Sequence, residues 1–78
     1  MTTVEIEYCV PCGLLEHAVD VQRRLLETHG RELDGVRLIP GHGGVFRVRA
    51  DGDLVWDKDE RGGIDPEAIV EAVRVDTD

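Results

Sequence analysis

The residues with the clearest chemical potential in this chain are Cys9 and Cys12, its only two cysteines. They stand in the segment Cys-Val-Pro-Cys, so a bridge between them would close a very small loop. Such a bridge is a poor structural staple, because the stabilisation from loop closure falls with loop length. A Cys-X-X-Cys pair is typical of reversible thiol–disulfide chemistry. One thiolate attacks a disulfide sulfur, and the second cysteine resolves the mixed disulfide.

The position of the pair in the chain supports this interpretation. Residues 3–8 alternate between apolar and polar side chains, which predicts a half-buried strand that leads directly into Cys9. From Leu14 onward the apolar residues follow a helical period, which predicts a helix opening at the pair with Pro11 in its first turn. Free N–H groups and the helix dipole stabilise a thiolate there, and such sites lower a thiol pKa from ~8.5 into the range ~3.5–7.5.

Zinc binding is the main alternative for the same cysteines, because two thiolates supply half of a tetrahedral zinc site. His17, His29 and His42 would have to supply the remaining ligands, since the sequence holds no second Cys-X-X-Cys. A zinc ion bridging two chains stays open as an alternative. We predict no metal and no cofactor other than the redox-active disulfide of Cys9 and Cys12.

The remaining elements predict a small α/β domain that positions the cysteines. A strand at residues 35–39 would complete a βαβ unit with a right-handed crossover. Residues 45–50 and 54–56 alternate around an Asp-Gly turn, which predicts an antiparallel hairpin that includes Trp56 in the core. A charged loop is expected at residues 57–63, and a second helix is expected to open with Asp65 as its N-cap.

The predicted order is β-α-β-β-β-α, and it fills residues 1–78 as a single domain. Because the strands alternate apolar and charged residues, one face of the sheet should be wet. Both helices are therefore expected on the other face of a mixed four-stranded sheet, in a two-layer sandwich. A Cys-X-X-Cys pair within a βαβ unit is typical of the thioredoxin-like fold.

The charge balance narrows the possible partners. Seventeen acidic residues face nine basic ones, for a net charge of −8, which argues against nucleic acid and anionic membranes as partners. No apolar run approaches the ~20 residues of a membrane span, and no secretory signal is visible, so we expect a cytoplasmic protein.

Eight of the nine bases are Arg. This acid-rich, lysine-poor composition predicts a high-salt cytoplasm, where ~1 M salt screens self-repulsion.

Four stretches resemble the selenoprotein W-like family, also called Rdx: residues 8–13 (YCVPCG), 40–46 (PGHGGVF), 54–57 (LVWD) and 62–63 (GG). The stretches occur in the right order, and the resemblance covers nearly the whole chain. The resemblance implies a thioredoxin-like fold and a thiol–disulfide oxidoreductase that uses the cysteine pair. We expect a monomer whose partners are protein disulfides or low-molecular-weight thiols. A non-enzymatic redox-sensing interaction module and a zinc-bridged dimer are the alternative functions.

The family pattern leaves the attacking sulfur open. Selenocysteine members carry selenium at the position of Cys12, which points to Cys12. Thioredoxin logic instead makes Cys9 the more exposed, attacking thiol, and we favour Cys9. The family's Phe-Pro after the late Gly-Gly is replaced here by Ile64 and Asp65, which removes whatever contact that Phe makes.

Four further residues are predicted to support the site: Pro11, Gly13, Gly43 and Gly44. Pro11 stiffens the turn between the cysteines. The glycine-rich loop is expected to bring its backbone close to the cysteines, because glycine permits close approach. A phosphate cradle is the less favoured interpretation of that loop, since no helix and no Lys follow it.

Overall fold

The computed structural model describes residues 2–73, which form seven elements. In chain order they are β1 (Thr2–Cys9), α1 (Leu15–His29), β2 (Leu33–Gly41), β3 (Phe46–Ala50), β4 (Asp53–Asp57), α2 (Lys58–Arg61) and α3 (Pro66–Ala72). The predicted order is confirmed, with the short helix α2 added. None of the helices in this part of the chain has the length and hydropathy of a membrane-spanning segment.

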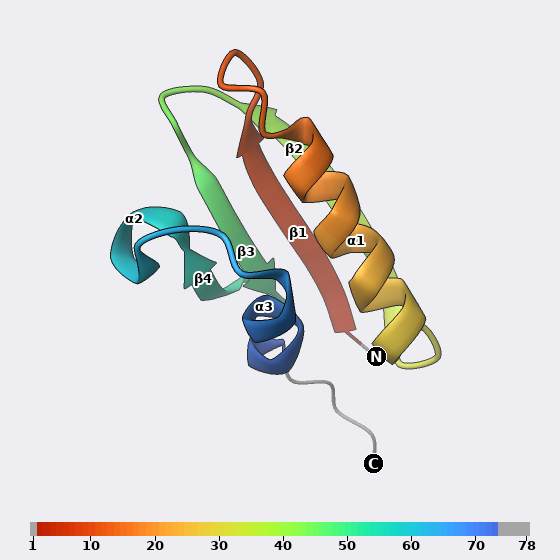
Figure 1. Ribbon diagram of the computed structural model, residues 1–78. Coiled ribbons are helices and arrows are strands. Elements are labelled where there is room, and N and C mark those ends of the chain that lie inside the picture. Colours follow the sequence, from red (N-terminus) through yellow and green to blue (C-terminus); the bar gives the residue numbers. More distant parts are fainter. Residues whose placement is uncertain (1, 74–78) are drawn as a thin grey trace.

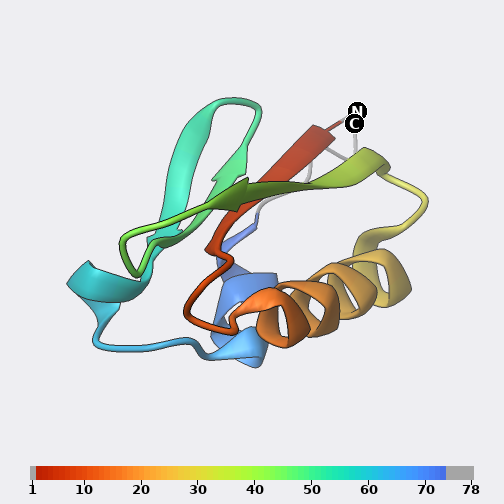
Figure 2. The same ribbon diagram turned by 90° about the horizontal axis from the view of Figure 1, so that it is seen from above.

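The four strands form one mixed sheet in the order β2-β1-β3-β4 (Figure 1). β1 pairs in parallel with β2, across the βαβ crossover, and antiparallel with β3, while β3 and β4 form a hairpin. Helices α1 and α3 lie against the same face of this sheet (Figure 2). The predicted two-layer arrangement is therefore confirmed, and β1 is its central, doubly paired strand.

The hydrophobic core lies between β1 and the two helices. The inward residues of β1 are Val4, Ile6 and Tyr8, and their β3 partners are Ala50, Val48 and Phe46. α1 contributes Ala18, Val21 and Leu25, and α3 contributes Ile69 as its buried residue. Aliphatic side chains supply most of this core, as the composition requires.

The opposite face of the sheet carries charged residues, as the alternation predicts. Glu5 and Glu7 of β1 are half-buried there. Arg37 Nη1 lies 3.7 Å from Glu5 Oε2, and Arg49 Nη1 lies 3.9 Å from Glu7 Oε1. Exposed ion pairs of this kind contribute only about 0–1 kcal/mol each to stability. Their main effect is to orient the charged side chains on this face of the sheet.

A bulge in the hairpin separates the roles of Leu54 and Trp56. The pairing register shifts between Val48 and Arg49, so Trp56 pairs with Val48 on the helix side while Leu54 pairs with Arg49 on the open side. Trp56 is buried, as predicted, and its Nε1 donates to the Gly63 carbonyl at 3.1 Å. Leu54 is left 44% exposed.

The expected charged loop at residues 57–63 contains helix α2. Asp57 caps this four-residue helix by accepting from the Asp59 N–H at 3.0 Å, and Gly62 ends it in the left-handed conformation. Asp residues favour such caps because their carboxylate accepts free N–H groups. A helix this short has no apolar periodicity, which is why the sequence did not predict it.

The predicted start of α3 is confirmed. Asp65 accepts from the Ala68 N–H at 3.3 Å, and Pro66 is the first helical residue.

On α1, partial burial raises the pKa of Asp20, but hydrogen bonds and charge from Arg24 and Arg23 outweigh burial and leave that pKa below its ordinary value. Asp20 therefore favours the folded state above the unfolded pKa, and this contribution is lost as pH falls.

The packing of α3 on the core can be tested with Ile69→Ala. α3 spans seven residues, which is too short for a stable isolated helix, so its contact through Ile69 should be essential. We expect Ile69→Ala to lower the free energy of unfolding by about 2–5 kcal/mol, measured by urea denaturation of the oxidised protein. Leu54→Ala, at an exposed site, is the control, with a loss below about 0.5 kcal/mol. Equal losses would contradict this packing.

Candidate functional site

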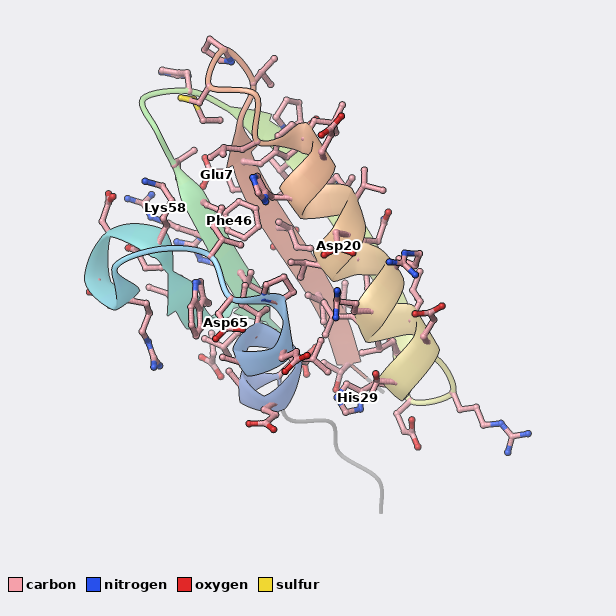
Figure 3. All side chains as sticks on the ribbon, viewed as in Figure 1. Glu7, Asp20, His29, Phe46, Lys58 and Asp65 are labelled. Atoms are coloured by element: carbon pink, nitrogen blue, oxygen red, sulfur yellow. A yellow bond between two sulfur atoms is a disulfide. The ribbon has the colours of Figure 1, made fainter. Side chains whose placement is uncertain are left out.

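Cys9 and Cys12 are joined by a disulfide, with their Cα atoms 5.3 Å apart, which lies within the usual range for such bonds. The bond, yellow in Figure 3, lies at the end of the molecule where β1 finishes. The turn after β1 and the connection from β2 to β3 lie side by side at this end (Figures 1 and 2). The two loops together form the surroundings of the disulfide.

The two cysteines differ sharply in exposure. Cys9 is 0% exposed, whereas Cys12 is exposed, so the expectation that Cys9 is the more accessible sulfur is wrong. The reason is strand pairing. Cys9 is still part of β1, and its N–H donates to the Val45 carbonyl at 2.8 Å while its register partner is Gly41. Cys12 lies beyond the sheet, in the turn.

The cysteine pair precedes α1 and is not part of its first turn. α1 begins at Leu15, so Pro11 lies in the exposed turn and not in the helix as expected. Hydrogen bonds from the Gly13 N–H to the Val10 carbonyl and from the Leu14 N–H to the Cys9 carbonyl close this turn at 3.1 and 3.3 Å. Gly13 has φ +75°, which glycine adopts readily and which keeps the helix from starting earlier.

The N-terminus of α1 faces the chain just after the exposed cysteine. Leu14 is the N-cap and provides no side-chain hydrogen bond to the first turn. Free N–H groups and the helix dipole therefore favour negative charge at this end of the helix. Because the cysteines precede the first turn of α1, stabilisation of a thiolate by this helix stays a prediction.

The glycine-rich loop approaches the cysteines, as predicted. In addition to the bond from Cys9, the Val10 N–H donates to the Gly41 carbonyl at 3.0 Å. Gly43 and Gly44 adopt φ of +76° and +80°, so they allow the loop to turn. A Cβ added to either would meet no atom within 4 Å, so neither is required for close packing.

Close packing occurs at Gly41, which the sequence did not single out. A Cβ there would lie 2.9 Å from Val45 Cγ1 and 3.2 Å from Glu7 Oε2. The side chains of Val45 and Glu7 therefore leave no room for a side chain at position 41, on the face of the sheet opposite the helices. Sequence patterns could not identify this position, because it depends on the register between β1 and β2.

The histidines do not gather around the cysteines. His29 is at the far end of α1, where its Nε2 lies 3.2 Å from the Val70 carbonyl oxygen, and His17 and His42 are exposed. Within residues 2–73, no group of three or more His, Cys, Asp or Glu side chains is arranged to hold a metal ion. A zinc site shared by two chains stays a hypothesis.

The chain is similar in sequence to known proteins. The model of the Rdx family matches residues 3–75. Migration and invasion enhancer 1 from Bos taurus is 34% identical over 73 residues, which are 91% of this chain. The chain covers 61% of the length of that relative, so the relative is the longer protein.

Two crystal structures are similar over nearly the whole chain. A protein from Bordetella parapertussis has a TM-score of 0.87 and 35% identity, covering 91% of each chain. A selenoprotein W-related protein from Vibrio cholerae has a TM-score of 0.89 and 28% identity, covering 94% of this chain and 92% of its own. These similarities confirm the predicted thioredoxin-like fold.

The close packing at Gly41 predicts opposite effects for two Gly→Ala substitutions in β2. Gly41→Ala should lower the free energy of unfolding by about 1–3 kcal/mol, because its methyl group overpacks Val45 and Glu7. Gly35→Ala meets no neighbour within 4 Å and should be neutral or stabilising by up to about 1 kcal/mol. Thermal or urea unfolding measures both, and an equally tolerated Gly41→Ala would refute the packing.

The net charge of −8 predicts that salt affects thiol reactivity. We expect the net negative charge to disfavour a thiolate at exposed Cys12, and raising salt from 0.1 to 1 M shortens the Debye length from ~10 to ~3 Å. Alkylation of Cys12 by neutral iodoacetamide, measured at fixed pH in Cys9→Ser, should therefore accelerate with salt relative to a small neutral thiol. If the ratio of the Cys12 alkylation rate to that of the small thiol stays flat or falls with salt, surface charge has no such influence.

Proposed function

The chain belongs to the Rdx family of selenoprotein W-related proteins, and from this premise we propose that it is a thiol–disulfide oxidoreductase. The observation that carries the proposal is the asymmetry of its disulfide, in which exposed Cys12 is bonded to buried Cys9. One sulfur can meet a partner molecule, and the other is held within reach of the first. Attack needs an accessible sulfur, and resolution needs a second sulfur within reach of the first.

We assign the attack to Cys12. In the reduced protein, its thiolate would attack one sulfur of a partner disulfide, forming a Cys12–partner bond while the partner's other sulfur leaves as a thiolate. Cys9 would then attack Cys12 Sγ, which re-forms the Cys9–Cys12 disulfide and releases the remaining partner sulfur. Two electrons pass to the partner, which becomes a dithiol, and a cytoplasmic thiol reductant would restore the pair.

The substrates we propose are protein disulfides or low-molecular-weight disulfides. Attack at Cys12 needs no enclosed pocket, because the sulfur lies in an exposed turn between exposed Val10 and Pro11 on one side and Gly13 on the other. The surface of the partner would then supply much of the specificity.

A redox-sensing interaction module is a second candidate, favoured by the apolar side chains that border the pair. Val10 is 51% exposed and Leu15 is 48% exposed. A partner that covers these residues would also cover Cys12, so its affinity would depend on the oxidation state. Such a module would exchange disulfides without sustained turnover.

Serine variants distinguish the roles of the two cysteines. Cys12→Ser should reduce the rate of disulfide reduction at least about 100-fold, because the accessible nucleophile is lost. Cys9→Ser should retain the attack and accumulate a mixed disulfide at Cys12, detected by mass spectrometry after reaction with an oxidised peptide. An insulin-type turnover assay with a thiol reductant measures the rates.

Three outcomes would contradict the proposal. A mixed disulfide that accumulates on Cys9 in Cys12→Ser, with turnover retained, would reverse the assignment. Wild-type rates in both variants would remove the pair from catalysis. Reversible oxidation of the wild-type protein without turnover would favour the sensing module.

A further inference from the structure

Resolution of a mixed disulfide on Cys12 requires the Cys9 thiol to lose its proton. Cys9 is 0% exposed in the disulfide-bonded protein, so a group of the protein is better placed than bulk water to accept this proton. Resting on the proposed function, the geometry points to Glu7 as the residue that accepts this proton. We propose that the Glu7 carboxylate, on the open face of the sheet, is the proton acceptor for Cys9 in the resolving step.

The first support is the direction of the two side chains. Side chains two residues apart in a strand point to the same face, and both Glu7 and Cys9 belong to β1. The residues between and before them, Tyr8 and Ile6, point into the core under the helices. Cys9 is buried, but it is not a member of that core cluster, as expected for a residue on the other face.

The second support is the reach of the Glu7 carboxylate along the sheet. Gly41 is the register partner of Cys9, whereas Glu7 is paired with Ile39. Oε2 of Glu7 nevertheless lies 3.2 Å from the point that a Cβ of Gly41 would occupy. The carboxylate thus extends from its own level of the sheet toward that of Cys9, and the absent side chain at position 41 leaves room for it.

The third support is the different environment of the two Glu7 oxygens. Oε1 faces Arg49 Nη1 at 3.9 Å, while Oε2 is the oxygen beside Gly41. Glu7 is labelled in Figure 3, near the end of β1 that bears the disulfide. One oxygen therefore orients the group, and the other is turned toward the cysteine end of the strand.

The resolving step transfers one proton from Cys9 to Glu7 and exchanges one disulfide bond for another. The Cys9 S–H bond breaks, its proton moves to Glu7 Oε2, and the electron pair stays on Cys9 Sγ. That thiolate attacks Cys12 Sγ, and the bond from Cys12 to the partner sulfur breaks, with its electron pair leaving on the partner. The released thiolate or solvent takes the proton from Glu7. The oxidant is the partner's organic disulfide, which gains two electrons over both steps.

Charged residues share the open face of the sheet with Glu7. They come from three strands: Glu5 on β1, Arg37 on β2, and Arg47 and Arg49 on β3. Arg47 is itself 3.5 Å from Asp57 of β4. Arg47 and Arg49 of the neighbouring strand place positive charge beside Glu7, and an ionised carboxylate is the form that accepts a proton.

A two-phase reaction separates this step from the attack. Reduced protein is mixed with one equivalent of a nitrobenzoate disulfide, which releases one coloured thiolate when Cys12 attacks and a second when Cys9 resolves. We expect Glu7→Gln to leave the first phase unchanged and to slow the second at least about tenfold, since general base assistance contributes 10²–10⁴-fold. The second phase of this variant should recover as pH rises and hydroxide replaces the carboxylate.

Controls distinguish proton transfer from simple charge and from misfolding. Glu5→Gln, two residues earlier on the same face, should leave both phases unchanged. Glu7→Asp, which keeps a carboxylate, should resolve faster than Glu7→Gln, with circular dichroism confirming the fold of each variant. A purely electrostatic Glu7 would oppose the thiolate, so its removal would accelerate the second phase.

The proposal is overturned if Glu7→Gln resolves as fast as wild type or faster, if Glu5→Gln slows resolution equally, or if Glu7→Asp is no faster than Glu7→Gln. If wild-type protein releases no coloured thiolate in either phase, the oxidoreductase function itself fails. A normal first phase with an unchanged second phase in Glu7→Gln rejects only the role of Glu7.

Discussion

The end of β1 is held on both sides, and the properties of the site depend on this constraint. The Cys9 N–H donates to the Val45 carbonyl, and the next N–H, of Val10, donates to Gly41 on the other side. The strand therefore remains part of the sheet up to Cys9, and the chain turns only afterwards. This places a buried sulfur at the end of the strand and an exposed residue, Cys12, in the turn three residues later.

Much of the fold follows from periodicity in the sequence. The alternation around Ile6 and Val48 predicted which strand faces are buried, and Asp65 predicted the start of α3. Periodicity is less informative where strand pairing determines which side chains are exposed. The exposures of Cys9 and Cys12 were predicted in the wrong order because alternation does not say how far strand pairing extends beyond an apparent end.

The features that the sequence did not predict depend on register or on single turns. Gly41 was seen as one of several loop glycines, yet its role follows from its position opposite Cys9 and beside Glu7. The bulge that places Leu54 and Trp56 on opposite faces depends on one shifted pair. The cysteine pair, in contrast, could be predicted as the candidate site from the composition and from its position between a strand and a helix.

The turn at residues 10–14 belongs neither to β1 nor to α1. Its backbone is held by the hydrogen bonds from Gly13 to Val10 and from Leu14 to Cys9, independently of the disulfide. Cleavage of the sulfur–sulfur bond would therefore remove a link inside one turn without breaking the hydrogen bonds of the sheet, the helix or the turn itself. A reduced form would then keep the same folded scaffold, in contrast to a protein whose fold depends on its disulfides and unfolds when they are reduced.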